Sequence, residues 1–409
     1  MLAVLRRRDF ALLWTASLIS TIGDWVLLGA LPFYVYQVTG SALASGATFM
    51  AEVLPMLLFG SVAGVFADRW DRKRTLVVAD LLRAGLVALL VLVRSPEWIP
   101  LIYVVGFLQS TVAQFAGTAF SAFMPRLVEP DHLGPANSAF SVTNNLGRLV
   151  GPGVGGLLMA SLGLGAVVLV DAGSFLAAGL LVYLIATNAE PLSAPHAGGS
   201  RFARVRREWL GGLRIVGGER WILVLLAAMG IATFGDSFLT VLLAPFISQV
   251  LGGDAALFGL VLTVRGLGGL VGGLMIGEIS RRLLPQRLIG LSAVALGLLL
   301  LAITALASVP ATLALIFVAG PAVIGFYVGA YTLLQGGVAD EYRGRVFGAY
   351  STVTALTLLV GMTLAGTLGD LVGIVSMLVV SALLYVAAGV TALAFLRPGP
   401  AVAVEAQAV

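Results

Sequence analysis

Long apolar stretches recur along the whole chain and alternate with short polar segments. Each stretch holds roughly 20 to 27 residues, the length that an α-helix needs to cross a bilayer with some tilt. The stretches occupy residues 10–36, 42–66, 75–93, 99–124, 135–161, 166–186, 221–249, 255–279, 288–307, 311–335, 346–370 and 372–395. This pattern predicts an all-α membrane protein with twelve transmembrane helices. A β-barrel would need short segments of alternating hydrophobicity instead.

A short motif in the first apolar stretch returns in the seventh. Residues 21–24 read TIGD and residues 233–236 read TFGD, an offset of 212 (233 − 21). Pro32 and Pro245 match at almost the same offset, 213 (245 − 32). A nearly constant offset predicts two homologous halves, and two membrane halves with a substrate site between them are typical of secondary transporters.

The repeat also predicts the domain organisation. We expect pseudo-symmetric six-helix bundles at residues 1–188 and 219–396, a cytoplasmic linker at 189–218 and a disordered tail at 397–409. The linker carries a basic run at residues 201–207, which would suit an amphipathic helix lying on the anionic lipid surface. A plain solvated linker is the alternative interpretation.

Composition narrows the class of protein further. Hydrophobic residues make up 59% of the chain and charged residues only 11%, which no soluble domain of this length resembles. There is no cysteine, and the two histidines are His132 and His196. Disulfides, thiolate chemistry and histidine-rich metal sites are therefore excluded. We expect no cofactor, with the proton as the coupling ion.

The basic residues are distributed unevenly along the chain. Twenty of the 24 Lys and Arg residues fall in segments that the twelve-helix arrangement places on one side of the membrane. This positive-inside bias predicts a multi-pass protein of the cytoplasmic (inner) membrane with both termini in the cytoplasm. The same clustering explains the net charge of +4 without nucleic acid as a partner. The basic N-terminus is not a cleavable signal, because the first stretch is too long.

The loop after the second stretch carries a charged motif. It reads GVFADRWDRKR over residues 64–74. The glycine allows close helix approach, and the acid can pair with arginine at the cytoplasmic rim to form a latch. The alternative is a topogenic basic loop, and the second-half copy at residues 277–282 is degenerate. The residues of interest are Gly64, Asp68, Arg69, Arg72 and Arg74.

The fifth stretch is rich in glycine. Residues 147–156 read GRLVGPGVGG, and the small residues at this spacing permit close packing of backbones. The proline in the middle is expected to bend the helix. The motif positions are Gly147, Gly151, Pro152, Gly155 and Gly156.

Together these motifs resemble those of the major facilitator superfamily. The loop motif resembles the superfamily signature between helices 2 and 3, apart from Asp71 in place of a glycine. The glycine-proline motif resembles that of its drug:proton antiporters, and residues 80–83, 169–175 and 339–348 resemble the branch of macrolide-efflux and enterobactin-exporting proteins. The resemblance implies the twelve-helix major facilitator fold, alternating access and export. One departure is that residues 99–124 hold no arginine where related antiporters often have one.

Charged residues inside the apolar stretches are the first functional candidates, because such charges are costly in a membrane. The mid-membrane set is Asp24, Glu52, Asp236, Arg148 and Arg265. We expect Asp24 and Glu52 to take up and release protons during transport. The alternative is that the set forms fixed ion pairs that hold the halves together.

Three further charges lie nearer the helix ends. Asp80 and Arg83 are three residues apart, so we expect them to form a structural pair near the cytoplasmic side. Asp171 lies near the outer end of the sixth stretch, where we expect a buried hydrogen-bonding acid.

The resemblance places the substrate cavity among helices 1, 4, 7 and 10. The candidates on these helices are Trp25, Phe33, Tyr34, Gln109, Gln114, Phe115, Phe246, Phe326, Tyr327, Tyr331 and Gln335. Aromatic walls with few polar groups suit amphiphilic, aromatic or cationic compounds. The alternative for some of them is contact with lipid.

The combined interpretation is a secondary active exporter of hydrophobic or amphiphilic small molecules, driven by proton antiport. A siderophore or lipid-like metabolite exporter is the first alternative, and a proton-coupled importer or uniporter is the second. No nucleotide-binding motif or catalytic cluster is present in the sequence, so we do not expect an enzyme. The expected partners are a small-molecule substrate and membrane lipids, and we expect a monomer.

Overall fold

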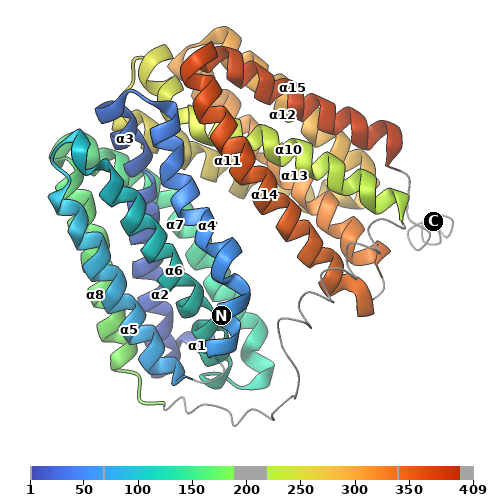
Figure 1. The fold of residues 1–409 in the computed structure, drawn as a ribbon. Coiled ribbons are helices and arrows are strands. Elements are labelled where there is room, and N and C mark those ends of the chain that lie inside the picture. The colour runs from blue at the N-terminus through green and yellow to red at the C-terminus, as the bar shows by residue number, and fades with distance from the viewer. Residues whose placement is uncertain (1, 68–69, 188–218, 339, 397–409) are drawn as a thin grey trace. The chain divides into compact units, whose positions relative to one another are not determined.

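The computed structural model describes residues 2–67, 70–187, 219–338 and 340–396, and the regular secondary structure in these ranges is helical (Figure 1). The predicted linker and tail fall outside the described residues. The first half contains α1 (Leu2–Leu5), α2 (Arg8–Leu28), α3 (Leu31–Thr39), α4 (Ala42–Ala67), α5 (Arg72–Ala88), α6 (Ile99–Phe123), α7 (Leu133–Leu162) and α8 (Leu164–Tyr183). The second half contains α10 (Arg220–Pro245), α11 (Ala255–Arg282), α12 (Pro285–Leu306), α13 (Val309–Gly337), α14 (Asp340–Val372) and α15 (Ile374–Phe395).

Eleven helical segments in the described ranges are long and apolar enough to cross a membrane. One of these, Arg8–Thr39, combines α2 and α3. The remaining long helix, α7, is more polar because Asn144, Asn145 and Arg148 lie near its middle. With α7 the described chain has the twelve long segments of the prediction, so the predicted all-α class is confirmed.

Glycines with positive φ make the tight turns between several of these helices. Gly40 (φ 66°) ends α3, Gly163 (φ 77°) separates α7 from α8, and Gly373 (φ 107°) separates α14 from α15. Only glycine adopts such backbone angles without steric cost. The chain can therefore reverse direction over one or two residues between long helices.

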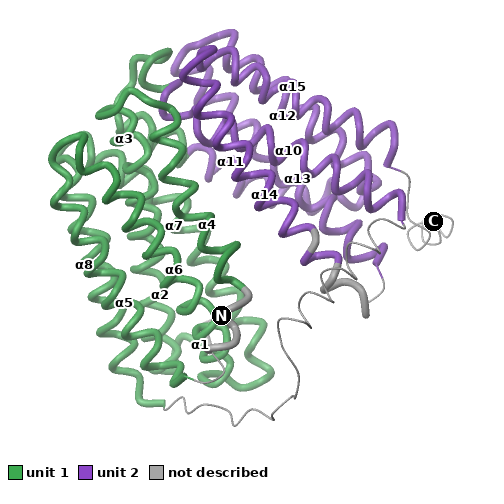
Figure 2. Tube along the Cα trace, in the orientation of Figure 1, with its two compact units in different colours: residues 1–195, 247–263 green, residues 196–246, 264–409 purple. Residues whose placement is uncertain are grey.

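The chain divides into two compact units (Figure 2). Unit 1 comprises residues 1–195 and 247–263, and unit 2 comprises residues 196–246 and 264–409. Unit 1 therefore includes the first part of α11 in addition to the helices of the first half.

In unit 1, α2 lies between α7 and α8, while α5 packs on α6 and α8 (Figure 1). Glycines of α7 let α2 approach α7 closely. A side chain added at Gly155 would overlap the carbonyl oxygen of Val26, and one at Gly151 would lie 2.9 Å from the carbonyl carbon of Trp25. A side chain added at Gly156 would likewise lie 2.9 Å from the Cα atom of Gly259, in the part of α11 that belongs to unit 1. The glycine motif thus lets two helices touch α7 by their backbones.

In unit 2, α12 packs on α13 and α15, and α10 packs on α14 and α15. Here too, glycine marks the closest approaches: a side chain added at Gly389 would lie 2.6 Å from the carbonyl oxygen of Gly290. An apolar core that includes Leu225, Ile289 and Ala382 fills the centre of this unit.

Candidate functional site

The central polar contact of unit 1 joins α2 to α5. Nη2 of Arg83 donates hydrogen bonds to both carboxylate oxygens of Asp24, at 2.7 and 3.0 Å. Nε2 of Gln109, on α6, donates to the same carboxylate at 3.2 Å. The guanidinium of Arg83 also lies over the ring of Phe175, 4.0 Å from its centroid. The Asp24 carboxylate is therefore held by side chains of two other helices, α5 and α6, and its side chain is still 38% exposed.

This contact corrects the expected pairing within α5. Asp80 and Arg83 were expected to form an ion pair, but among the described residues the arginine is paired with Asp24 instead. One turn of helix does bring Asp80 and Arg83 to the same face of α5. The arginine side chain is long enough to reach α2, however, and Asp24 offers it two carboxylate oxygens there.

Asp171, on α8, is fully buried beside this contact, in agreement with the expectation of a buried acid. The hydroxyl of Ser174 donates to its carbonyl oxygen at 2.7 Å and lies 3.4 Å from Oδ1. Its Oδ2 atom has no hydrogen-bond partner among the described residues. A side chain added at Gly23, next to Asp24, would lie 2.6 Å from Oδ1 of Asp171. The glycine of the repeated motif therefore makes room for this acid.

The other two mid-membrane charges of unit 1 lie elsewhere. Glu52 has an exposed side chain on α4, and its backbone carbonyl accepts a hydrogen bond from the Ser110 hydroxyl at 2.6 Å. Arg148 is exposed on α7, with its guanidinium 5.7 Å from the centroid of the Trp25 ring. The structure thus brings Asp24 together with Arg83, which the sequence did not single out as its partner.

Unit 2 holds a second arginine–aspartate contact. Nη2 of Arg265, on α11, donates to Oδ1 of Asp236, on α10, at 3.2 Å. The hydroxyl of Tyr385, on α15, donates to the same oxygen at 2.8 Å. The alternative of fixed ion pairs that hold the halves together included Arg265, but in the structure Arg265 pairs with Asp236 inside unit 2. Tyr385 was not expected at the site, because a tyrosine in an apolar stretch carries no sign of its partner.

Several cavity candidates form an aromatic cluster in unit 2. Tyr331 stacks on Phe347, with ring centroids 6.0 Å apart and planes at 12°, and on Tyr327 at 6.5 Å. Tyr350 meets the same ring edge to face at 6.0 Å. Tyr327 and Tyr331 are partly exposed, at 37% and 38%. A flat exposed ring with a second ring behind it can stack against a planar or cationic ligand.

Other cavity candidates are buried in their own units. Phe33, Phe246 and Phe326 have almost no exposed surface, and Phe33 stacks on Phe258 at 5.7 Å. Because their rings are enclosed by neighbouring side chains, they do not offer a surface to a substrate in this structure.

The remaining candidates of unit 1 are partly buried. Trp25 lies against the glycines of α7, Tyr34 donates its hydroxyl to the Val93 carbonyl at 3.4 Å, and Phe115 stacks on Trp70 at 6.0 Å. The backbone carbonyl of Gln114 accepts a hydrogen bond from Thr118.

The charged loop motif lies at the end of α4 and the start of α5. Asp68 and Arg69 lie outside the described residues, and Gly64 is described only as part of α4. Asp71 caps α5, because its Oδ1 accepts a hydrogen bond from the backbone N–H of Arg74 at 2.8 Å. Arg72 is buried and Arg74 is exposed. The aspartate in place of the family's glycine thus begins the helix that carries Asp80 and Arg83.

The described residues contain no group of three or more His, Cys, Asp or Glu side chains that could hold a metal ion. The contacts of Asp24 with Arg83 and of Asp236 with Arg265 and Tyr385 join carboxylate, guanidinium and phenol groups. Such groups can exchange protons and ion-pair partners.

Comparison with known proteins places the chain in a family. Macrolide efflux protein A of Streptococcus pyogenes is 25% identical over 377 residues, covering 89% of this chain and 90% of that protein. Multidrug efflux pump Tap of Mycobacterium tuberculosis is 30% identical over 397 residues, covering 92% and 91%. The crystal structure of a mutant of the nucleoside transporter NupG superposes with a TM-score of 0.77 at 13% identity, covering 95% and 100%. That last similarity concerns the fold.

The sequence also matches the transmembrane secretion effector family over residues 1–408, which is nearly its whole length. This is a transporter family and not an enzyme family, and the helical architecture agrees with it. The chain is a multi-pass membrane protein that belongs to the transmembrane secretion effector family of the major facilitator superfamily.

Proposed function

We propose that this protein exports hydrophobic or amphiphilic small molecules from the cytoplasm by proton antiport. The observation that carries the proposal is the contact between Asp24 and Arg83 inside a membrane-spanning bundle. The names of two relatives, a macrolide efflux protein and a multidrug efflux pump, support export of this class of compound.

The proposed coupling follows from charge balance. An isolated charge in a membrane helix is costly, and a carboxylate beside a guanidinium avoids that cost. When Asp24 takes up a proton, the attraction to Arg83 falls and the arginine is released. Protonation of one carboxyl can thus bias the bundle between two arrangements of α2 and α5. Substrate and proton then move in opposite directions as the protein alternates between inward-open and outward-open states.

The proposal extends to orientation and assembly. Both termini lie in the cytoplasm, the protein resides in the cytoplasmic membrane, and the monomer is the transporting unit. The loop at residues 64–74 acts as a latch at the cytoplasmic rim. The aromatic cluster around Tyr331 supplies stacking surface for planar or cationic substrates. Asp236 with Arg265 and Tyr385 holds the second bundle together.

The test uses the purified full-length chain in proteoliposomes that enclose a pH-sensitive dye. Erythromycin and ethidium serve as probes of a macrolide and a planar cation. We expect either probe to drive proton movement in the parent, and we expect Asp24→Asn to abolish it while probe binding persists. Asp131→Asn, in an exposed loop between α6 and α7, is the matched control and should behave as the parent.

Two outcomes would count against this function. If Asp24→Asn moves protons as fast as the parent, Asp24 is structural. If neither probe drives proton movement in the parent but both accumulate down an imposed gradient, the protein is an importer or uniporter.

A further inference from the structure

Unit 1 contains a partly open cavity next to Asp24. It has a volume of about 200 Å³ and is lined by residues of α2, α5, α6 and α8. Its polar walls come from α2 and α5, and its apolar walls from α6 and α8. The polar lining residues are Ser17, Ser20, Thr21, Asp24, Asp80 and Arg83. The cavity therefore lies inside one bundle, and both carboxyl groups that flank Arg83 line it.

The cavity extends from Asp24 toward one end of the bundle. Along α2 it runs from Asp24 back to Leu13, which is about 16 Å for 11 residues (24 − 13) of α-helix. It also touches Leu76, near the start of α5, and Val182, near the end of α8. All three helices thus place it toward the same end of the bundle.

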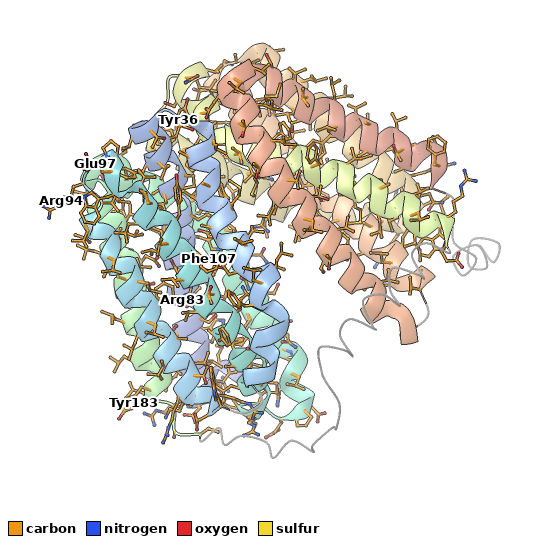
Figure 3. The ribbon with its side chains drawn as sticks, in the orientation of Figure 1. Tyr36, Arg83, Arg94, Glu97, Phe107 and Tyr183 are labelled. Carbon is orange, nitrogen blue, oxygen red and sulfur yellow. The ribbon has the colours of Figure 1, made fainter. Side chains whose placement is uncertain are left out.

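That end is the one predicted to face the cytoplasm. Figure 3 shows Tyr183 at one end of unit 1 and Arg94 with Glu97 at the other, with Arg83 between them. The chain segments near Tyr183 include the basic starts of α2 and α5. The positive-inside bias puts those segments in the cytoplasm. The cavity therefore leads from Asp24 toward the cytoplasmic side.

One donor in the cavity wall has no protein partner. The Nε atom of Arg83 is buried and makes no hydrogen bond to any described residue. A buried donor of this kind is normally satisfied by ordered water. A cavity of about 200 Å³ has room for several waters, each needing about 30 Å³. The polar groups that line it give such waters the partners that they require.

On the basis of the proposed antiport, we propose that this cavity is a water-filled proton route from Asp24 to the cytoplasm, with Asp80 as the proton carrier along it. The route runs inside the N-terminal bundle.

The exchange balances in charge and in protons. Protonated Asp24 gives its proton through water to the Asp80 carboxylate, and Arg83 leaves Asp80 for the newly charged Asp24. When Asp24 takes up its next proton from the opposite side of the membrane, Arg83 returns to Asp80, and the neutral Asp80 then releases its proton toward the cytoplasm. Because Asp80 and Arg83 are one helical turn apart, the guanidinium can serve either acid. The contact with Asp24 in this structure is the arrangement after Asp24 has lost its proton.

The other ionisable groups nearby do not take part. Asp171 of α8 is fully buried, has hydrogen-bonding contact only with Ser174 among the described residues, and does not line the cavity. Glu52 of α4 and Arg148 of α7 have exposed side chains and do not line the cavity. Gln109 of α6 donates to Asp24 and does not titrate.

The first experiment asks whether water reaches the cavity. The chain has no cysteine, so single cysteines can be introduced without background labelling. Ala113→Cys and Ala178→Cys place a thiol in the cavity wall. Ala119→Cys and Ala172→Cys are matched controls on the same two helices, buried away from it. In inside-out vesicles, a small water-soluble methanethiosulfonate should label the first pair and not the second. Equal labelling of the two pairs would overturn the route.

The second experiment tests Asp80 in the proteoliposome assay. We expect Asp80→Asn to slow probe-driven proton movement by about 100-fold, as for loss of a proton-transfer group, while probe binding is retained. Asp80→Glu should restore the rate and shift its pH profile, which a purely structural acid would not do. If Asp80→Asn moves protons as the parent does, the carrier role fails while antiport stands. If the parent itself moves none, antiport fails, and the labelling result still reports on the cavity.

Discussion

Arg83 lies 2.7 Å from Asp24, although 59 residues separate them, and this contact links α5 to α2. The corresponding acid of the second half, Asp236, is held by Arg265 of α11 and by Tyr385 of α15. Both halves thus have an acid at the repeated position, but the arginine that pairs with it comes from a different helix in each half. Repeat-equivalent acids in unlike surroundings are expected to differ in function, because the partners decide when each can ionise.

Removing the cation alone should destabilise unit 1. In Arg83→Gln, Asp24 is left in the bundle without its counter-ion, and we expect a loss of about 1–3 kcal/mol, since Asp24 remains partly exposed. The double variant Arg83→Gln with Asp24→Asn should recover much of that loss, because neither charge remains. Thermal unfolding in detergent measures both. A loss in the double variant equal to the sum of the losses in Arg83→Gln and Asp24→Asn would show that the pair contributes no coupling energy.

The phenol in unit 2 should have a smaller effect. Tyr385→Phe removes one hydrogen bond to Asp236 but leaves Arg265 in place, so we expect about 1 kcal/mol of destabilisation. Tyr183→Phe, on an exposed side chain, is the control and should leave the unfolding temperature unchanged. Loss of probe-driven proton movement in Tyr385→Phe at full stability would contradict a structural role for this contact.

The glycine motif of α7 should tolerate no side chain at its closest contact. In Gly155→Ala the new methyl group meets the backbone carbonyl of Val26, which cannot move aside, so we expect at least about 1–3 kcal/mol of lost stability. Gly173→Ala, in α8, meets nothing within 4 Å and should be neutral or slightly stabilising. Detergent-extracted yield and unfolding temperature compare the two. A well-folded Gly155→Ala protein would show that α2 and α7 are not locked at this point.

The exposed tyrosine stack should recognise planar cations. Tyr331→Ala removes the ring that stacks on Phe347, and we expect ethidium affinity to fall by an amount equivalent to about 0.5–2 kcal/mol. Tyr331→Phe keeps the ring and should bind nearly as the parent does. Fluorescence anisotropy in detergent measures both affinities. Unchanged binding in Tyr331→Ala would place this ring against lipid rather than substrate.

Much of the architecture can be predicted from local pattern. Apolar stretches of membrane-crossing length predicted the helices, and glycines at positions 40 and 163 mark turns that the structure makes with positive φ. The spacing of Gly151 and Gly155 predicted close backbone packing of the fifth helix, and α7 packs in this way on α2. These features depend on residues close in sequence or on composition, so they need no knowledge of the partner helix.

The pairing of charges depends on the packed bundle instead. Asp24 is recognisable in the sequence as an acid within a membrane helix, yet nothing near it names Arg83 as its partner, and the spacing of Asp80 and Arg83 favours a different pair. Helical periodicity defines the face on which a residue lies, but the neighbour on that face depends on how the helices rotate and approach. Gly23 and Gly155 set that approach for α2, since they let α8 and α7 come close. Local sequence thus determines the membrane topology and the positions of the acids, whereas contacts between segments far apart in the chain determine which cation pairs with each acid.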